Sequence, residues 1–157
     1  MTKDFDKKTG YLKPGIHKFT LEKLMHHKIL ANTETRRHLI QNLKLACEFY
    51  WSYDIENIFI DGSFATEKPY PADIDGVICF EGFEDQRLEK ILESQSVWGD
   101  FSPYDPSKPG DKFRMWYEYQ IEFYIHPIHK PFKHNTFLEF FQHSRDDEPR
   151  GIIQVTK

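Results

Sequence analysis

Helical periodicity dominates the first third of the chain. From about residue 33 to residue 52, apolar side chains recur every three or four positions and form one stripe, while charged residues lie off it, as in an amphipathic helix. A shorter helix is predicted from about 21 to 30, opened by Thr20. Residues 1–15 are predicted to form an extended arm, which a Pro-Gly pair separates from the helices. The apolar stripe consists of Leu39, Leu43, Ala46, Cys47 and Tyr50.

Period-two alternation predicts strands in the rest of the chain. Short strands are expected at about 56–60 and 73–80, and the longest alternating run, over 113–126, predicts one long strand that ends at a proline. Residues 99–112 are rich in Gly, Pro, Asp and Ser, which predicts a loop. The pattern is typical of one α+β domain over residues 1–157. Further elements are expected at 84–93 (a helix with Leu88, Ile91 and Leu92 inward), 136–143 (a Phe-rich helix) and 152–155 (a short edge strand).

Asp73 and Asp75 are the most informative residues of this pattern. Side chains alternate along a strand, so the two aspartates project from one face while Ile74 points into the core. At about 4 Å and an effective dielectric constant near 20, two carboxylates repel each other by about 4 kcal/mol, and a bound cation offsets that cost. Carboxylates select hard ions such as Mg²⁺ or Mn²⁺. The pair therefore predicts a divalent metal site.

A turn before this pair predicts a phosphate-binding site. An apolar strand breaks at Gly62-Ser63, where the missing Cβ of glycine lets backbone N–H groups and a hydroxyl approach a phosphate closely. Lys68, Arg114 and Lys130 are candidates for neutralising phosphate charge. For each of these three, an ordinary solvated surface cation is the alternative interpretation.

The two motifs together resemble the signature of the DNA polymerase β-like nucleotidyltransferase superfamily. In that signature, a hydrophobic residue, Gly and Gly or Ser are followed about ten residues later by Asp-hydrophobic-Asp. Here the sequence reads Ile60-Asp61-Gly62-Ser63 and then Asp73-Ile74-Asp75, with one extra residue before the glycine. Gly76 departs from the pattern, because the superfamily usually has a bulky hydrophobic residue there. The resemblance implies a polymerase β-type palm, with a mixed or antiparallel sheet flanked by helices. It also implies a nucleoside triphosphate as substrate and Mg²⁺ or Mn²⁺ as cofactor.

The same resemblance implies a third metal-binding carboxylate on a neighbouring strand. Glu122 meets this expectation, because it lies on the polar register of the long alternating run, between Ile121 and Phe123. Glu118 is the competing candidate on the same face, about 13 Å away along an extended strand. The predicted catalytic and metal-binding residues are Asp73, Asp75 and Glu122, and the predicted nucleotide-binding residues are Gly62, Ser63 and Lys68.

A closer resemblance extends over almost the whole chain. Its motifs are Leu12-Lys13-Pro14-Gly15-Ile16-His17, Thr20-Leu21-Glu22, Arg36-Arg37, the stretch 61–69, the stretch 71–75 and Gly151-Ile152-Ile153. These motifs are similar to those of an uncharacterised bacterial family of minimal nucleotidyltransferase-like proteins. That likeness implies a palm with two added N-terminal helices, but it carries no settled activity.

Composition and charge narrow the possible functions. Among 157 residues, 21 Lys and Arg against 25 Asp and Glu give a net charge of −4, so contact with nucleic acid is expected to be local, at an RNA end for example. Cys47 and Cys79 form no Cys-x-x-Cys motif and are expected to be reduced thiols of a cytoplasmic protein. No signal peptide is visible, and no apolar run approaches the roughly 18 to 20 residues of a membrane span, so no membrane contact is expected.

Two residue groups have a simpler explanation than a ligand site. His126 and His129 have a spacing typical of metal ligands, but the proline between them prevents a helix and no thiolate or third histidine is evident nearby, so zinc is not expected. Trp116, Tyr117 and Tyr119 can stack a base, although packing in the core is the favoured interpretation.

Two functions are compatible with these observations. The first is a metal-dependent nucleotidyltransferase that transfers a nucleoside monophosphate to a hydroxyl of RNA or a tRNA end, a protein or a small molecule. The second is a catalytically silent palm that binds a nucleotide or a partner protein, for instance as a regulator in a toxin-antitoxin or phage-defence system. The presence of all three carboxylates favours the enzyme, because each is costly to keep without a metal. The sequence contains no base-reading motif, so the acceptor and the base are left open.

Overall fold

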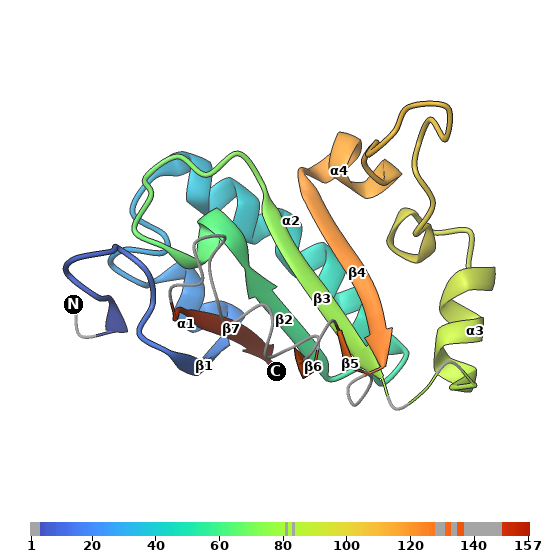
Figure 1. Cartoon of the computed structure of the whole chain (residues 1–157), viewed down its shortest axis with the longest axis horizontal. Helices are drawn as coiled ribbons and strands as arrows, with labels where there is room; N and C mark the ends of the chain where they lie inside the picture. The colour runs from blue at the N-terminus through green and yellow to red at the C-terminus, as the bar shows by residue number, and fades with distance from the viewer. Residues whose placement is uncertain (1–3, 81, 83, 128–130, 133–134, 137–148) are drawn as a thin grey trace.

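A mixed five-stranded sheet forms the centre of the protein, as seen in a computed structural model that describes residues 4–80, 82, 84–127, 131–132, 135–136 and 149–157. Figure 1 shows the sheet with the helices around it. The strand order is β1-β7-β2-β3-β4, and β5 and β6 form a separate pair. The strands are β1 (Gly15–Thr20), β2 (Asn57–Asp61), β3 (Ile74–Phe80), β4 (Ile121–Pro127), β5 (Pro131–Phe132), β6 (Asn135–Thr136) and β7 (Gly151–Thr156). The helices are α1 (Leu21–Met25), α2 (Glu34–Ser52), α3 (Gln86–Glu93) and α4 (Arg114–Tyr119), with short 3₁₀ turns η2 (Gly62–Ala65) and η3 (Val97–Gly99).

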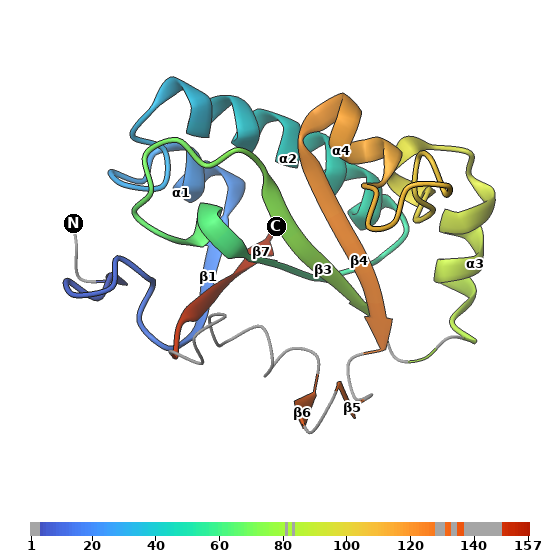
Figure 2. The ribbon, with the colours of Figure 1, turned by 45° about the horizontal axis from the view of Figure 1, so that its top comes forward.

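The hydrophobic core lies between the sheet and α2. The predicted amphipathic helix is confirmed, and its apolar stripe is buried. Thr33 caps its start, because the threonine hydroxyl accepts a hydrogen bond from the backbone N–H of Arg36 at 3.2 Å. Figure 2 shows α2 lying along one face of the sheet. The side chains of the sheet that belong to this core are Ile58, Ile60, Ile74, Ile78, Ile121, Phe123, Ile153 and Val155.

Strand directions in the centre of the sheet follow from the connections. β2 and β3 form an antiparallel pair, whereas β3 and β4 run parallel and are joined by the crossover segment that contains α3, η3 and α4. β7 pairs antiparallel with β2 and parallel with β1. Along each strand, side chains that point into the core alternate with side chains on the opposite face. The acidic side chains of β2, β3 and β4 lie on that opposite face, away from α2.

The long strand predicted over 113–126 is wrong in its first half. Its residues up to Tyr119 form α4, and only the second half forms β4. Met115 is fully buried and Tyr119, one helical turn later, stacks on Trp98 at 4.8 Å between ring centroids, so this segment also satisfies a helical pattern. Gln120 ends the helix in the left-handed conformation, with φ of 55° and its N–H donating to the carbonyl of Trp116 at 2.8 Å. Aromatic residues at many positions of a six-residue segment made the two periods indistinguishable.

The expected edge strand at 152–155 is present, but it is not at the edge. β7 lies between β1 and β2, because β1, which the sequence pattern did not predict, pairs outside it. β1 carries polar side chains such as His17 and Lys18, which are typical of an edge strand and hide the alternation. Two smaller corrections concern helices: α1 ends at Met25, and Leu92 of α3 is 50% exposed rather than inward.

The N-terminal segment is joined to the core. Phe5 and Leu12 form an antiparallel bridge and are both buried, and Tyr11 forms a bridge to Thr66. The segment is therefore adjacent to the chain that follows the Gly62-Ser63 turn. The Phe-rich helix predicted over 136–143 lies outside the described residues except for its first position.

Candidate functional site

Three carboxylates lie side by side on the face of the sheet that is turned away from α2. Asp61, the last residue of β2, is the register partner of Asp75, and Asp75 is in turn the partner of Glu122. Because neighbouring strands are about 4.8 Å apart, the row brings three acidic side chains within about 10 Å. We call these three residues the carboxylate row.

Glu122 is the most enclosed member of the row, at 1% exposed. Its Oε2 accepts a hydrogen bond from the backbone N–H of Phe113 at 2.7 Å. Its Oε1 accepts one from the hydroxyl of Tyr124 at 2.7 Å and lies 3.5 Å from Nζ of Lys112. These contacts fix the orientation of the carboxylate at the start of β4 and compensate for its burial.

Burial raises the pKa of both Asp61 and Asp75. Burial raises the pKa of Asp61 to about 7, with the charge of Asp75 adding to the increase and that of Arg150 opposing it. The Arg150 guanidinium lies 3.6 Å from Asp61 Oδ2. Burial also raises the pKa of Asp75 to about 6, and the charges of Asp73 and Glu122 add to that increase, while Lys112 lowers it. The row is therefore electrostatically costly, and positive charge beside it is stabilising.

Asp73 lies just before β3 rather than on it. Its Oδ2 accepts a hydrogen bond from the indole N–H of Trp116 in α4 at 2.8 Å. The predicted pairing with Asp75 on one strand face is thus replaced by a loop position held from α4. The two aspartates remain close enough for their charges to interact, because Asp73 contributes to the raised pKa of Asp75.

The Gly62-Ser63 turn directly adjoins the carboxylate row. Gly62 has a φ of 71°, and a Cβ added to it would lie 3.3 Å from Oδ2 of Asp75. Glycine is therefore required both for the left-handed backbone and for the close approach of the carboxylate. Ser63 is the next residue of η2, and its carbonyl accepts a hydrogen bond from the hydroxyl of Thr66 at 2.6 Å.

A buried arginine holds the segment that follows this turn. Arg36 of α2 is 0% exposed, and its guanidinium donates to the carbonyls of Phe64, Thr66 and Lys68 at 2.6 to 2.9 Å. The same guanidinium lies 4.8 Å from the ring centroid of Phe64. Burial lowers the pKa of Arg36 to about 10, which leaves it protonated at neutral pH. The helix thereby fixes the loop that carries Gly62, and the sequence analysis did not foresee this role.

The three predicted phosphate-binding cations are placed differently. Lys68 is exposed at the end of the turn segment, with its carbonyl bound to Arg36. Arg114 forms ion pairs with Asp100 at 3.8 Å and Glu118 at 3.6 Å. Lys130 lies outside the described residues. Glu118, the competitor of Glu122 for the third carboxylate, is on α4 and not on the strand.

Sequence reasoning missed the residues that carry the positive charge of the site. Lys112 comes from the predicted loop before α4, and Arg150 comes from the segment just before β7. No local pattern marks either residue, since tertiary structure alone brings them to the row. Asp61 was detectable, because it belongs to the motif and directly follows a predicted strand, but it was treated as one extra residue before the glycine.

The structure gives a physical reason for the unusual Gly76. A Cβ at this position would lie 2.3 Å from the carbonyl oxygen of Phe59 and 2.5 Å from the ring of Phe123. Phe123 is the register partner of Gly76 on β4, so its ring fills the volume that a larger side chain would otherwise take. Glycine is therefore the residue that fits at this position of β3.

A divalent metal ion at this site would need side-chain ligands from the residues near the carboxylate row. Within the described residues, no group of three or more His, Cys, Asp and Glu side chains is arranged to hold a metal. The chemistry nevertheless fits a hard ion, because Asp73 and Asp75 offer oxygen ligands in a site where a cation relieves repulsion. Of the histidine pair considered for zinc, His126 lies opposite Cys79 on β3, and His129 is outside the described residues.

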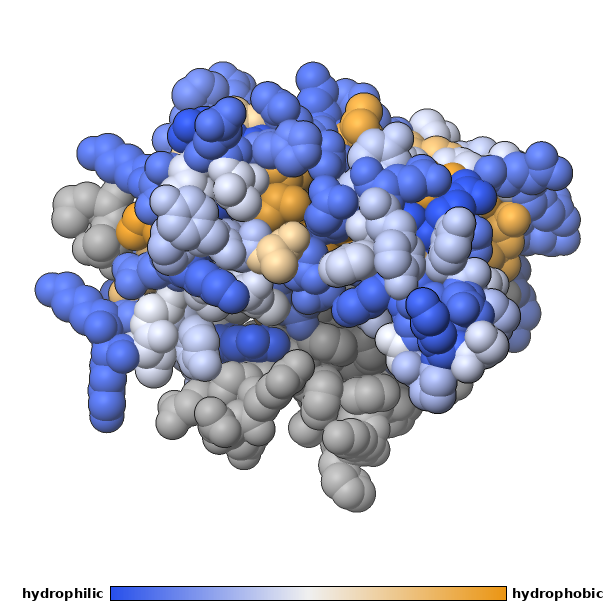
Figure 3. Space-filling view, turned by 90° about the horizontal axis from the view of Figure 1, so that it is seen from above, coloured by the Kyte–Doolittle hydropathy of each residue, from blue (hydrophilic) through white to orange (hydrophobic). Residues whose placement is uncertain are grey.

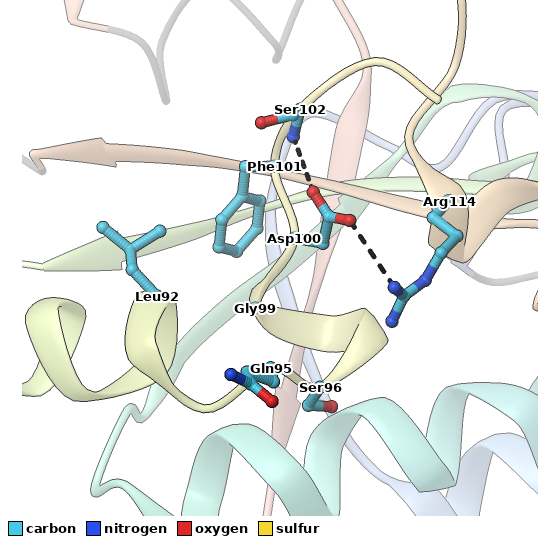
Figure 4. A pocket seen from close by; sticks show the side chains of 8 residues that line it. All are labelled: Leu92, Gln95, Ser96, Gly99, Asp100, Phe101, Ser102 and Arg114. Carbon is cyan, nitrogen blue, oxygen red and sulfur yellow. Dashed lines mark hydrogen bonds and ion pairs between the residues drawn. The ribbon is translucent and has the colours of Figure 1, made fainter. Parts of the chain in front are cut away.

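A separate cavity of about 450 Å³ lies between the end of α3, η3 and the start of α4. Figure 4 shows Arg114 and Asp100 paired across it, and Leu92 and Phe101 at its apolar side. None of the carboxylate row lines this cavity. In the view of Figure 3, apolar side chains are scattered in small groups among hydrophilic ones.

The comparisons with known proteins give one match. Residues 3–156 match the model of a family described as "Family of unknown function (DUF6932)". The chain belongs to the DUF6932 family. No curated protein and no solved structure matches the chain. This DUF6932 member also has, among its described residues, no helix with the length and apolar character needed to cross a membrane.

Proposed function

We propose that this protein is a metal-dependent nucleotidyltransferase built on a polymerase β-type palm. It transfers a nucleoside monophosphate from a nucleoside triphosphate to an acceptor hydroxyl. The observation that carries the proposal is the carboxylate row, Asp61, Asp75 and Glu122, in register on three adjacent strands beside the Gly62-Ser63 turn. The antiparallel β2–β3 pair followed by a helical crossover to the parallel β4 supports the palm topology.

The chain's own groups have distinct roles in this proposal. Asp73 and Asp75 hold Mg²⁺ or Mn²⁺, which when bound supplies charge stabilisation for the phosphates and for the attacking oxygen. The Gly62-Ser63 turn offers backbone N–H groups and a hydroxyl to the β- and γ-phosphates, and Lys68 lies at the end of the same segment. The Arg36 guanidinium binds backbone carbonyls of that segment, so the turn is preorganised.

The reaction is a single in-line displacement. The acceptor hydroxyl oxygen forms a bond to the α-phosphorus, and the bond from this phosphorus to the α,β-bridging oxygen breaks. Pyrophosphate leaves with the electron pair of that bond, and the hydroxyl proton passes to water. Glu122, fixed by Phe113 and Tyr124, presents negative charge beside the attacking hydroxyl.

Label transfer tests the proposal. Purified protein is incubated with each α-³²P nucleoside triphosphate, Mg²⁺ or Mn²⁺, and pooled RNA, protein and small-molecule acceptors. Label is expected to enter one acceptor class with the parent protein and to be absent with Asp75→Asn. Glu93→Gln is the matched control, because it neutralises an exposed carboxylate on α3, away from the row. Absence of label with every nucleotide, metal and acceptor would refute the enzyme.

A second candidate function is a catalytically silent palm that binds a nucleotide or a partner protein, as a regulator in a toxin-antitoxin or phage-defence system. The observation that favours it is the internal pairing of the row: Lys112 lies 3.5 Å from Glu122, and Arg150 lies 3.6 Å from Asp61. A site neutralised by its own cations does not need a metal. Under this alternative, a nucleoside triphosphate binds equally well in EDTA and in Mg²⁺, and no label is transferred.

We also propose that the protein acts in the cytoplasm. Cys47 and Cys79 are both free and buried, and burial raises the pKa of the Cys79 thiol to about 12, which keeps it protonated and unreactive. Reduced, inert thiols are typical of a reducing compartment.

A further inference from the structure

An exposed group of aromatic side chains adjoins the carboxylate row. We call Tyr104, Trp116, Tyr117 and Tyr124 the aromatic surface. Tyr104 is 66% exposed, Tyr117 is 45% exposed and Tyr124 is 42% exposed. Single exposed rings are common on protein surfaces, but a cluster of exposed rings is unusual. Such clusters commonly mark a binding site.

Tyr104, Tyr117 and Trp116 form a chain of ring contacts, whereas the ring of Tyr124 packs against Phe113 at 5.1 Å between centroids. The ring centroids of Tyr104 and Tyr117 are 5.3 Å apart, and those of Trp116 and Tyr117 are 5.2 Å apart. The indole N–H of Trp116 is bound to Asp73, and the hydroxyl of Tyr124 is bound to a carboxylate oxygen of the row. The surface is therefore continuous from the carboxylates to the outermost tyrosine.

Core packing does not account for this surface. Tyr119, on the same short helix, shows what a packed ring looks like here, because it stacks on the buried Trp98 at 4.8 Å. Tyr104 instead belongs to the segment between η3 and α4 and is the most exposed ring of the surface. Its exposed area contributes no burial to folding, so a ligand that covers it gains that hydrophobic free energy on binding.

The strand order decides which part of a reaction this surface serves. The Gly62-Ser63 turn follows β2, and α4 precedes β4, so the two lie on opposite sides of β3 and Asp75. Figure 1 shows α4 at the start of β4, beside the start of β3. A triphosphate on the turn therefore has its α-phosphorus near the row, and the attacking hydroxyl comes from the side of the aromatic surface. The surface lies where an acceptor would bind.

A positive charge accompanies the rings. Nζ of Lys112 lies 5.9 Å from the ring centroid of Trp116 and is 3.5 Å from the row, on a side chain that is 40% exposed. Aromatic rings that stack bases, next to a cation that meets the phosphodiester, are the elements by which proteins bind single strands. The net charge of −4 restricts such contact to a few nucleotides.

We propose that the aromatic surface binds the unpaired end of a nucleic-acid strand and presents its terminal hydroxyl to the carboxylate row. This inference rests on the proposed function and names its acceptor class. Bases stack on Tyr104 and Tyr117, and Lys112 neutralises the adjacent phosphate. The nucleobase of the triphosphate lies elsewhere, on the side of the turn.

Binding of short oligonucleotides tests this inference independently of catalysis. The Asp75→Asn variant, in which turnover is prevented, is titrated against 5′-fluorescein-labelled single-stranded hexanucleotides of RNA and DNA, and against a longer, stably paired blunt duplex, with anisotropy as the readout. The single strands are expected to bind more tightly than the duplex. In the same background, Tyr104→Ala and Tyr117→Ala are expected to weaken the single-strand affinity by about 5- to 150-fold, the range for losing one stacked base.

Matched variants separate stacking from folding. Tyr104→Phe keeps the ring and is expected to retain the affinity, whereas Leu92→Ala removes a similarly exposed apolar side chain on α3 and is expected to change nothing. Thermal melting shows whether each variant is folded. A fluorescent nucleoside triphosphate with Mg²⁺, titrated against the otherwise unsubstituted protein, reports the triphosphate site, and its affinity is expected to be unchanged by Tyr104→Ala.

The outcomes for the acceptor and for the enzyme are distinguishable. If the triphosphate binds but the hexanucleotides do not, or bind equally well to folded Tyr104→Ala, the acceptor assignment is overturned and the nucleotidyltransferase proposal stands. If Tyr104→Ala weakens the triphosphate instead, the surface belongs to its nucleobase and the inference is equally overturned. If the hexanucleotides bind through the tyrosines but no label is ever transferred, the surface stands and the enzyme does not.

Discussion

Replacing Asp75 by Asn is expected to stabilise the metal-free protein at pH 8. Burial and neighbouring carboxylates raise the pKa of Asp75 from 3.8 to about 6. A folded-state pKa above the unfolded value means that ionisation costs stability, and the cost builds as pH rises from about 4 to about 6. Each unit corresponds to about 1.4 kcal/mol, so the full cost is about 3 kcal/mol above pH 7 and about 1 kcal/mol at pH 4.5. The amide removes this cost and keeps the shape.

Unfolding in EDTA measures the effect. Urea titrations of the parent protein and of Asp75→Asn at pH 8 and pH 4.5 give the free energy of unfolding of each. The gain at pH 8 corresponds to a melting temperature higher by about 6 to 12 °C for a chain of this length. Adding Mg²⁺ is expected to raise the melting temperature of the parent protein much more than that of the variant, because the bound ion offsets the same repulsion.

A control and two possible results decide whether the reasoning is correct. Glu93→Gln removes an exposed carboxylate and is expected to leave the stability within about 0.5 kcal/mol at both pH values. If Asp75→Asn were less stable than the parent protein at pH 8 in EDTA, the carboxylate would be a favourable partner in the folded state. If its stability gain were the same at both pH values, the cause would not be the ionisation of Asp75.

Three further substitutions test the site and its support. Arg36→Lys is expected to lower the free energy of unfolding by about 3 kcal/mol or more in urea titrations, because one ammonium cannot serve the buried carbonyls that the guanidinium binds. Gly76→Ala is expected to cost about 1 to 3 kcal/mol, since its Cβ would overlap a backbone oxygen and the ring of Phe123; a neutral effect in the same titration would show that β3 and β4 can separate. In label transfer, Asp73→Asn is expected to abolish activity, while Ser63→Ala lowers it by about 10- to 1,000-fold; equal effects of the two would argue against separate metal and phosphate roles.

The sequence predicted the centre of the site because alternation along strands is a local property. The resemblance called for a third carboxylate on a strand next to that of Asp75, the alternating pattern selected Glu122 for it, and the structure places the two residues opposite each other. Gly62 was assigned to a tight turn, and it has the positive φ that such a turn requires.

The parts that the sequence could not predict depend on contacts between distant segments. Lys112 and Arg150 reach the row only through the folding of a loop and of the chain before β7. β1 is defined by its pairing with β7 rather than by its own pattern. In α4, the local alternation predicted a strand, and the contact of Tyr119 with Trp98, which the sequence pattern does not contain, favours the helix.

The two ion pairs of the row differ in how easily their charges can be separated. Arg150 is only 18% exposed and its partner Asp61 is 10% exposed at the side chain, so separating them would leave two charges poorly solvated. Lys112, by contrast, is 40% exposed, and its ammonium can return to water while Glu122 keeps its bonds to Phe113 and Tyr124. The ion pair at the β4 end of the row is therefore the more exposed of the two, and it lies at the end next to the aromatic surface. Asp61 and Arg150 form the more enclosed pair, so the proposed chemistry is assigned to Asp73, Asp75 and Glu122.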